Sequence, residues 1–292
     1  MKNLTEHQKG LLFVFIAAFL WSSGGLLIKL ITISPMQISF FRCTIAAITF
    51  AIIFRKKILQ FNKLTFLNSV FYACVLISFV ISTKLTTAAN AIFLQATAPI
   101  YVLIFEPLIN KTRYERINVV TIAICFIGMI LFFVGKIEPG HFAGNMVALF
   151  SGLSFAAFFL GMKKNDHKYQ RSSIFYGNVL VAIVCIPFLF SLQGLTFSNL
   201  WMVTVLGVFQ IAIAYAFFAS GLKRIIAVEA SIISMIEPVF NPVWVFWGYG
   251  EVPAIPAIIG GLIIIGAIVV RTLIAGAPFL KGKFNNSLKE PV

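Results

Sequence analysis

Two ionisable side chains stand inside long apolar segments of the chain. Arg42 lies within the apolar segment 36–54, and Glu237 lies near the middle of the apolar segment 226–247. An ionisable residue inside a membrane-crossing helix usually faces a cavity or a partner, and it marks a substrate or proton pathway. For Arg42 we weigh two interpretations. It is a cation that faces a cavity and attracts a substrate carboxylate or pairs with a Glu, or its long side chain extends to the lipid headgroups.

Glu237 directly precedes Pro238. Proline removes one backbone hydrogen bond and loosens a helix at that point, so Pro238 and Pro99 are candidate hinges. A carboxyl group in apolar surroundings can exchange a proton near neutral pH. We therefore interpret Glu237 as a proton-coupling or substrate-binding group, with a structural, protonated Glu bonded to a neighbouring helix as the alternative. Glu229, near the start of the same segment, is expected at the interface.

Polar or small side chains recur at helical spacing in two of the apolar segments. They are Thr86, Asn90, Thr97 and Tyr101 in the first, and Ala230, Ser234, Glu237 and Asn241 in the second. A polar stripe on a membrane helix faces protein or water rather than lipid. We expect these two stripes to line a cavity, and the alternative is helix packing through interhelical hydrogen bonds.

Aromatic rings offer flat faces that stack on apolar or cationic substrates. The candidates are Trp21, Tyr101, Tyr215 and Trp244. Trp21 and Tyr215 lie deepest in their segments and are favoured for the cavity, as are the deep polar residues Asn178 and Gln210. The alternative for the aromatic residues is an interfacial belt or core packing.

The elements that must position these residues are membrane-crossing helices. The 292 residues are 60% hydrophobic and 11% charged, with a mean hydropathy of +0.98, whereas soluble domains carry roughly 25% charged residues. Lipid is therefore the expected solvent. Apolar segments of about 20 residues, long enough to cross a bilayer, recur ten times. They fall near 10–30, 36–54, 65–83, 87–107, 117–135, 143–162, 172–191, 199–221, 226–247 and 254–274.

The Lys and Arg residues predict how these segments are oriented. Of the 23 basic residues, 19 fall on alternate connections and at the two termini, three (Lys29, Lys84 and Lys136) fall on the opposite side, and Arg42 lies within a segment. Basic residues concentrate on the cytoplasmic side of membrane proteins, so both termini are predicted to be cytoplasmic. The same pattern explains the net charge of +14 without a nucleic-acid partner.

Ten helices divide into two halves of five, residues 1–138 and 139–292, and an odd number per half inverts the second half in the membrane. Internal similarity supports this division. When Pro99 is aligned with Pro238, Asn90 falls on Glu229 and Gln95 on Ser234. Inverted repeats that meet around a midplane cavity are typical of secondary transporters. The fold class is therefore an all-α integral membrane protein of two inverted five-helix repeats.

The chain resembles the drug/metabolite transporter superfamily, in its ten-helix EamA-type branch. The features that carry the resemblance are Phe19-Leu20-Trp21-Ser22-Ser23, Pro35 with Phe40-Phe41-Arg42, Ala98-Pro99, and Glu237-Pro238-Val239 with Gly250-Glu251. The resemblance implies a central cavity and the transport, often the export, of amino acids, other metabolites or toxic compounds across a bacterial cytoplasmic membrane. One departure is that Gly250-Glu251 has no counterpart after the fourth segment, where Arg113 occupies the matching region.

The alternatives to a transporter are a membrane-embedded lipid-modifying enzyme and a channel. The enzyme needs clustered acids or a His or nucleophile pair, but the only Asp is Asp166 and the three His residues lie outside the spans. A channel needs rings of charge or an oligomeric filter. No GxxxxGK[ST] loop is present, so transport is not driven by ATP within this chain. The expected partners are a small-molecule substrate and the lipid bilayer, with no cofactor or metal. The small-residue spacing of Ala257 and Gly261 is consistent with a homodimer.

Overall fold

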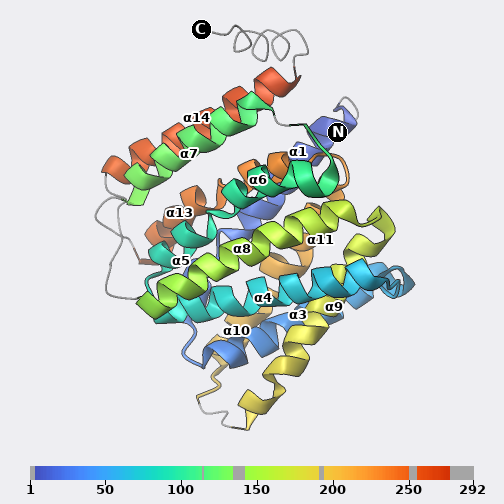
Figure 1. Cartoon of the computed structure of the whole chain (residues 1–292). Coiled ribbons are helices and arrows are strands. Elements are labelled where there is room, and N and C mark those ends of the chain that lie inside the picture. Colours follow the sequence, from blue (N-terminus) through green and yellow to red (C-terminus); the bar gives the residue numbers. More distant parts are fainter. Residues whose placement is uncertain (1–3, 114, 134–141, 191–193, 250–254, 277–292) are drawn as a thin grey trace, which may run out of the picture.

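The described part of the chain is a bundle of helices in a computed structural model of residues 4–113, 115–133, 142–190, 194–249 and 255–276 (Figure 1). In the first half the helices are α1 (Glu6–Trp21), α2 (Gly24–Leu30), α3 (Pro35–Phe54) with the short 3-10 turn η1 (Arg55–Ile58), α4 (Lys63–Leu85), α5 (Ala88–Gln95), α6 (Ala98–Asn110) and α7 (Arg116–Phe133).

The second half continues in the same way. Its helices are α8 (Phe142–Lys164), α9 (His167–Cys185) with the 3-10 turn η2 (Ile186–Leu189), α10 (Phe197–Val205), the π-helix η3 (Leu206–Ile213), α11 (Ala214–Leu222), α12 (Ala227–Ser234), α13 (Glu237–Tyr249) and α14 (Ile255–Gly276). No strand occurs among the described residues.

Eight helical stretches of the described residues are long and apolar enough to cross a membrane. They are Glu6–Leu30, Pro35–Ile58, Lys63–Leu85, Asn90–Asn110, Phe142–Lys164, His167–Leu189, Phe197–Leu222 and Ala227–Gly248. The other two segments expected from the sequence, 117–135 and 254–274, correspond to the shorter apolar helices Arg116–Leu131 and Ile258–Ile274. Large apolar side chains such as Ile52, Leu108 and Leu262 lie on the outside of the bundle, 70%, 71% and 64% exposed. A surface of this kind matches lipid rather than water.

Three of the membrane-length stretches are interrupted near their middle. The interruptions fall at 22–23 between α1 and α2, at 96–97 between α5 and α6, and at 235–236 between α12 and α13. Pro99 and Pro238 stand at the second position of α6 and α13, where a missing N–H costs no helical hydrogen bond. Hydroxyl groups satisfy carbonyls at two of the breaks: Ser22 donates to Phe19 O at 2.6 Å, and Thr97 donates to Leu94 O at 2.7 Å.

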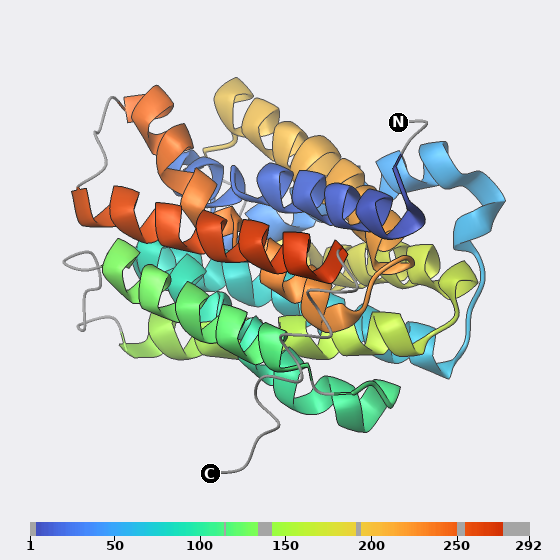
Figure 2. The same ribbon diagram turned by 90° about the horizontal axis from the view of Figure 1, so that it is seen from above.

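Glycine permits the closest helix crossings in the bundle. Helices α7 and α14 lie side by side (Figures 1 and 2), and a Cβ on Gly128 would stand 2.9 Å from the backbone oxygen of Gly260. Helices α1 and α11 cross in the same way, where a Cβ on Gly221 would lie 2.8 Å from Gly10 O. Only a residue without a side chain allows backbones to approach this closely.

Hydrogen bonds join separate helices at both ends of the bundle. One end of the bundle, where helices α1 and α12 begin, is called the amino-terminal end. At this end His7 Nε2 lies 3.1 Å from the Glu229 carboxylate, and Lys163 Nζ donates to Ile225 O at 2.7 Å. At the opposite end, Lys29 Nζ donates to Thr86 O at 2.8 Å, and the Thr32 amide donates to Asn199 Oδ1 at 3.1 Å. Both ends are therefore closed by contacts between helices.

Candidate functional site

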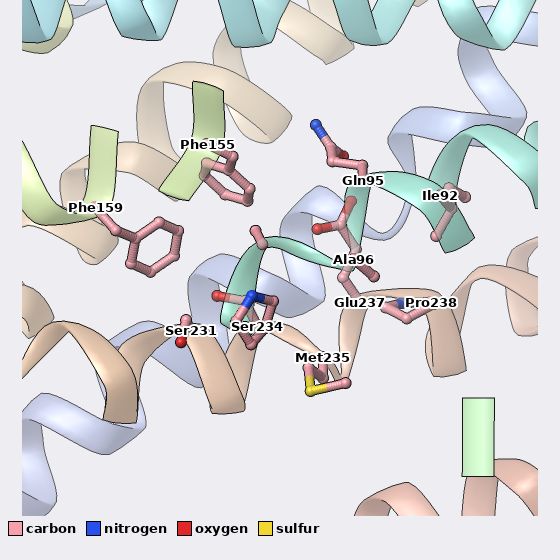
Figure 3. A pocket seen from close by; sticks show the side chains of 12 residues that line it. Ile92, Gln95, Ala96, Phe155, Phe159, Ser231, Ser234, Met235, Glu237 and Pro238 are labelled. Carbon is pink, nitrogen blue, oxygen red and sulfur yellow. The ribbon is translucent and has the colours of Figure 1, made fainter. Parts of the chain in front are cut away.

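Two small cavities lie in the centre of the bundle, between residues of both halves of the chain. The first is lined by Ile92, Gln95, Ala96, Ala98, Pro99, Phe155, Phe159, Ser231, Ser234, Met235, Glu237 and Pro238 (Figure 3). The second is lined by Trp21, Arg42, Val75, Leu76, Phe79, Gln95, Phe155, Gln210, Tyr215 and Glu237. Gln95, Phe155 and Glu237 line both cavities, so these three side chains form the partition between them.

Both central cavities are small. Each has a volume of about 20 Å³, which holds about one water molecule. An organic molecule larger than water therefore enters only when the surrounding side chains or helices move apart.

Glu237 is the first residue of α13 and stands where the interrupted stretch resumes as a helix. The residue is 9% exposed, and its side chain lies among those that line the first cavity (Figure 3). No other described residue forms a hydrogen bond or ion pair with its carboxyl group. The structural alternative, a Glu bonded to a neighbouring helix, thus has no bonding partner in the described part of the chain. The carboxyl group is available to a ligand or a proton in the cavity.

Arg42 brings a buried cation to the second cavity. The residue is 0% exposed, so its side chain does not extend to the lipid headgroups. Its Nη2 donates to Leu76 O at 2.7 Å, whereas Nε and Nη1 have no hydrogen-bond partner among the described residues. A buried donor without a partner costs about 1–3 kcal/mol, and more when it is charged. Arg42 and Glu237 line the same cavity without forming an ion pair.

Other polar atoms without partners surround the same cavity. Trp21 Nε1 and Gln210 Oε1 are buried and have no hydrogen-bond partner in the part of the chain that the structure describes. Around the second cavity there are thus three unpaired donor nitrogens, on Arg42 and Trp21, and one unpaired acceptor oxygen, on Gln210. Buried polar groups are usually paired, so this group of atoms fits a polar ligand that arrives during a working cycle.

Aromatic rings form one wall of the second cavity. The Trp21 ring centroid lies 4.8 Å from that of Tyr215 and 5.6 Å from that of Phe155, and Tyr215 lies 4.7 Å from Tyr72. These centroid separations are those of favourable aromatic pairs. Trp21, Tyr215 and Phe155 thus add aromatic surface to the cavity that Arg42 and Glu237 also line.

The structure brings together most of the residues predicted from the sequence, but not all of them. Eight line the central cavities: Trp21, Arg42, Pro99, Gln210, Tyr215, Ser234, Glu237 and Pro238. The other four, Asn90, Tyr101, Asn178 and Asn241, are not among the residues that line these two cavities.

The three asparagines make structural hydrogen bonds instead. Asn90 Nδ2 donates to Thr86 Oγ1 at 3.0 Å and to Asn145 Oδ1 at 3.1 Å. Asn178 Nδ2 donates to Ile174 O at 2.9 Å, and Asn241 Nδ2 donates to Ser22 O at 3.0 Å. For these positions, the interhelical and local hydrogen bonding considered as the alternative describes what the structure shows.

Among the lining residues that were not predicted from the sequence, Gln95 and Phe155 line both cavities. Gln95 Nε2 donates to Ser151 Oγ at 2.8 Å, and its side chain lines both cavities. The alignment of Gln95 with Ser234 was the sequence feature that could have identified Gln95 as a lining residue. Phe155 lies within an apolar run of α8, and nothing in its local sequence distinguishes it from a lipid-facing Phe.

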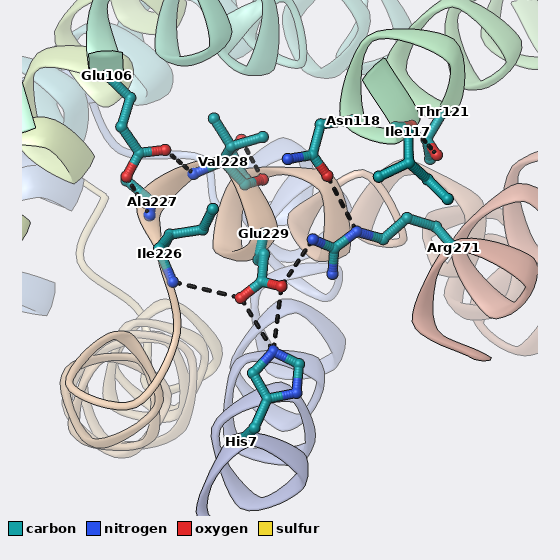
Figure 4. A network of polar contacts seen from close by, with 11 residues as sticks. His7, Glu106, Ile117, Asn118, Thr121, Ile226, Ala227, Val228, Glu229 and Arg271 are labelled. Carbon is teal, nitrogen blue, oxygen red and sulfur yellow. Dashed lines mark hydrogen bonds and ion pairs between the residues drawn. The ribbon is translucent and has the colours of Figure 1, made fainter. Parts of the chain in front are cut away.

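A network of charged residues ties helices together at the amino-terminal end (Figure 4). The Glu229 carboxylate accepts from Arg271 Nη2 at 2.6 Å, and Arg271 Nε donates to Asn118 Oδ1 at 3.1 Å. Glu106 accepts from the backbone amides of Ala227 and Val228, both at 2.7 Å. This carboxylate therefore caps the first turn of α12 and satisfies two of its free N–H groups.

One sequence-based expectation is corrected by this network. Arg271 was counted with the basic residues that follow the last helix, but it lies inside α14 and is 1% exposed. Its ion pair with Glu229, which is 6% exposed, lets both side chains be buried. That Glu229 lies at the level of the membrane interface stays a prediction.

No group of three or more His, Cys, Asp or Glu residues that could hold a metal ion occurs within the described ranges. The four cysteines are free thiols. The central site therefore presents one cation, one carboxyl group, amides and aromatic rings, which suit reversible binding of a small organic molecule.

The comparison with known protein families decides the identity. The model of the EamA-like transporter family matches residues 8–134 and residues 142–273. The chain belongs to the EamA-like transporter family. As a family member with eight membrane-length helical stretches and two shorter apolar helices among its described residues, it is a multi-pass membrane protein, and the resemblance inferred from sequence motifs is confirmed.

Relatives of this EamA-like chain are also named as transporters. An uncharacterized transporter of Clostridium kluyveri is 25% identical over 97% of this chain and 99% of its own length. An uncharacterized transporter of Archaeoglobus fulgidus is 27% identical over 69% of this chain and 73% of its own length. The pseudopaline exporter CntI of Pseudomonas aeruginosa is 22% identical over 89% of this chain and 94% of its own length.

A solved crystal structure of another protein has the same fold. It superposes with a TM-score of 0.77, at 17% identity, over 92% of this chain and 98% of that chain. This similarity covers nearly all of both chains and shows that they share a fold.

Proposed function

We propose that this EamA-like protein is a secondary transporter that exports small organic metabolites, such as amino acids or toxic compounds, across a bacterial cytoplasmic membrane. The observation that carries the proposal is that two buried ionisable residues, Arg42 and Glu237, line one small cavity in the centre of the bundle without forming an ion pair with each other. A protein retains such groups at a cost in stability when they serve substrate or ion binding.

The proposed architecture has ten membrane-crossing helices in two inverted halves, with both termini in the cytoplasm. The family model matches once in residues 8–134 and once in residues 142–273, on either side of the division at 138/139. Corresponding helices also break at aligned positions: α5 ends at Gln95 and α12 ends at Ser234. Because these two residues are aligned when Pro99 is placed on Pro238, the two breaks support the repeat.

The proposed mechanism is alternating access, in which the two halves rock about the central cavity. The chain can bend at 96–97 and 235–236, directly before the helices that begin with Ala98-Pro99 and Glu237-Pro238. Opening toward the cytoplasm requires the contacts at the amino-terminal end to separate, including the Glu229–Arg271 ion pair. Opening to the other side requires the contacts of Lys29 and Asn199 to separate. The small central cavities fit an intermediate between these two states.

The direction of transport is proposed from a relative. CntI is a pseudopaline exporter, and it is related to this chain over most of both lengths. Within the cavity, Arg42 can attract a carboxylate, and Glu237 can bind a proton or an amine. In this proposal a proton gradient drives export through Glu237.

The experiment is flux into proteoliposomes under an imposed pH gradient, with a panel of labelled amino acids and toxic analogues. Wild type is expected to move at least one compound above protein-free liposomes. Glu237→Gln is expected to lower gradient-dependent flux roughly tenfold or more, the effect of losing one charge-assisted bond. Glu6→Gln is the matched control, because Glu6 is exposed, lines neither central cavity and forms ion pairs with Lys9 and Arg224. Gradient-dependent flux that is unchanged in Glu237→Gln would remove Glu237 from coupling, and no flux of any compound would contradict the proposal.

A further inference from the structure

A third cavity lies at the amino-terminal end, away from the central site. Its volume is about 380 Å³, which is within the range of small-molecule sites and far larger than either central cavity. It lies between α1, the start of α9 and the end of α11. Its lining residues are Phe13, His167, Lys168, Gln170, Arg171, Ala219, Ser220, Lys223 and Arg224.

The lining of this cavity is strongly basic. Four of the nine lining residues are Lys or Arg, and none is Asp or Glu. Arg224 pairs with Glu6, with Nε 2.8 Å from the carboxylate. Lys168, Arg171 and Lys223 form no ion pair with any described residue. The Arg171 guanidinium lies 4.5 Å from the Phe54 ring centroid and Lys168 Nζ lies 4.8 Å from the Tyr169 ring centroid. All three basic residues line the cavity without a carboxylate partner among the described residues, which favours an anionic occupant.

The start of α9 strengthens the positive field. This helix has 19 residues and no acidic residue in its first turn, and the side chain of Asp166 at its N-cap makes no capping hydrogen bond. The amino-terminal end of a helix carries partial positive charge, yet His167 and Lys168 occupy the first two positions here. An anion in the cavity would interact favourably with both the backbone N–H groups and the basic side chains.

The cavity also has an apolar side. The Phe13 ring lies 5.7 Å from the Phe217 ring, and the Arg224 guanidinium lies 5.4 Å from the Phe13 centroid. The cavity stands at the ends of membrane-length helices, which is the level of the lipid headgroups. A ligand with a phosphate and attached acyl chains matches this combination better than a free anion does.

We infer that this cavity binds the phosphate-bearing head group of an anionic phospholipid. Lys168, Arg171 and Lys223 contact the phosphate, and the acyl chains leave along the aromatic side formed by Phe13 and Phe217. Anionic lipids are abundant in the cytoplasmic leaflet, where the proposed orientation places this end. The inference depends on membrane embedding and not on which substrate the central site carries.

The test is native mass spectrometry of the full chain in neutral detergent with dioleoylphosphatidylglycerol or dioleoylphosphatidylcholine, together with thermal shifts for each lipid and for inorganic phosphate. Wild type is expected to retain one phosphatidylglycerol with at least about tenfold preference over phosphatidylcholine. The variant Lys168→Gln/Arg171→Gln/Lys223→Gln is expected to lose that preference. The control variant Arg55→Gln/Lys56→Gln/Lys57→Gln removes three exposed basic residues of η1 at the same end and is expected to keep it.

Several outcomes would overturn the inference. Equal retention of the two lipids by wild type would show that the cavity does not select charge. An equal loss in both triple variants would point to diffuse attraction by the whole basic end. A thermal shift with inorganic phosphate that matches the shift with phosphatidylglycerol would identify a free-anion site instead. If the cavity triple variant does not fold, Lys168→Gln and Lys223→Gln, at exposed positions, are each expected to reduce binding about fivefold.

Discussion

Removal of the Arg271 guanidinium is expected to destabilise the protein more than removal of both members of its ion pair with Glu229. The two side chains are 1% and 8% exposed and 2.6 Å apart. The single substitution Arg271→Met leaves the Glu229 carboxylate buried with only His7 and the Ile226 amide as partners. It also leaves Asn118 Oδ1 without its donor from Arg271.

The magnitude follows from the burial of the pair. Breaking a buried ion pair by removing one partner costs about 3–5 kcal/mol, whereas replacing both partners with apolar residues is often neutral or stabilising. Because Glu229 keeps two weaker partners, we expect about 3 kcal/mol for Arg271→Met, or roughly 6–12 °C in melting temperature. The double variant Glu229→Met/Arg271→Met is expected to lie within about 1 kcal/mol of wild type.

The assay is thermal unfolding of the four proteins of the cycle in one detergent at one protein concentration. The coupling energy is the difference between the double variant and the sum of the single variants. If Arg271→Met and the double variant lose the same stability, the two residues do not act as a buried pair. If Arg271→Met lowers the free energy of unfolding by less than about 1 kcal/mol, the Glu229–Arg271 ion pair contributes no more than an exposed ion pair does.

Three further predictions concern the central site, the helix packing and the topology. Arg42→Met is expected to abolish flux with little change in melting temperature, because the loss of one hydrogen bond, from Nη2 to Leu76 O, is offset by removal of a buried charge whose Nε and Nη1 have no partners. A stability loss that parallels the flux loss would show a structural role. Gly152→Ala is expected to lower the free energy of unfolding by about 1–3 kcal/mol, because the new Cβ would stand 2.9 Å from Gln95 O. Gly266→Ala is the control: its Cβ would meet nothing within 4 Å, so the free energy of unfolding is expected to rise by about 0.5–1 kcal/mol. In a variant without the native cysteines, Lys56→Cys is expected to resist an impermeant thiol reagent in intact cells and to react after permeabilisation; reaction in intact cells would contradict the proposed orientation.

The positions of the helices could be predicted from the sequence because lipid imposes a strong pattern. A span needs about 20 apolar residues, and alternate connections concentrate Lys and Arg, so one end of each helix is marked by charge. The breaks before Pro99 and Pro238 were also predictable, since proline removes a hydrogen bond. The break at Ser22-Ser23 and the π-helix η3 carry no comparable local signal, and they depend on how neighbouring helices pack.

The candidate site was most directly predictable where a residue was costly by itself. Arg42 and Glu237 stand out because a charge in an apolar segment needs a reason, and both line the second cavity. The sequence could not show whether Asn90 and Asn241 line a cavity or form structural hydrogen bonds, because an amide on a helix can do either. The pairing of Glu229 with Arg271, 42 residues apart in the chain, follows from tertiary contact, which no periodicity reveals.

The π-helix η3 has a consequence for the energetics of the proposed cycle. Two inverted halves of identical shape could exchange their conformations, and the inward and outward states would then have equal free energy. Here η3 interrupts the third stretch of the second half, while the matching stretch of the first half, α4, is a continuous α-helix of 23 residues. In the proposed alternating-access cycle, this difference between the two halves makes the inward and outward states unequal in free energy.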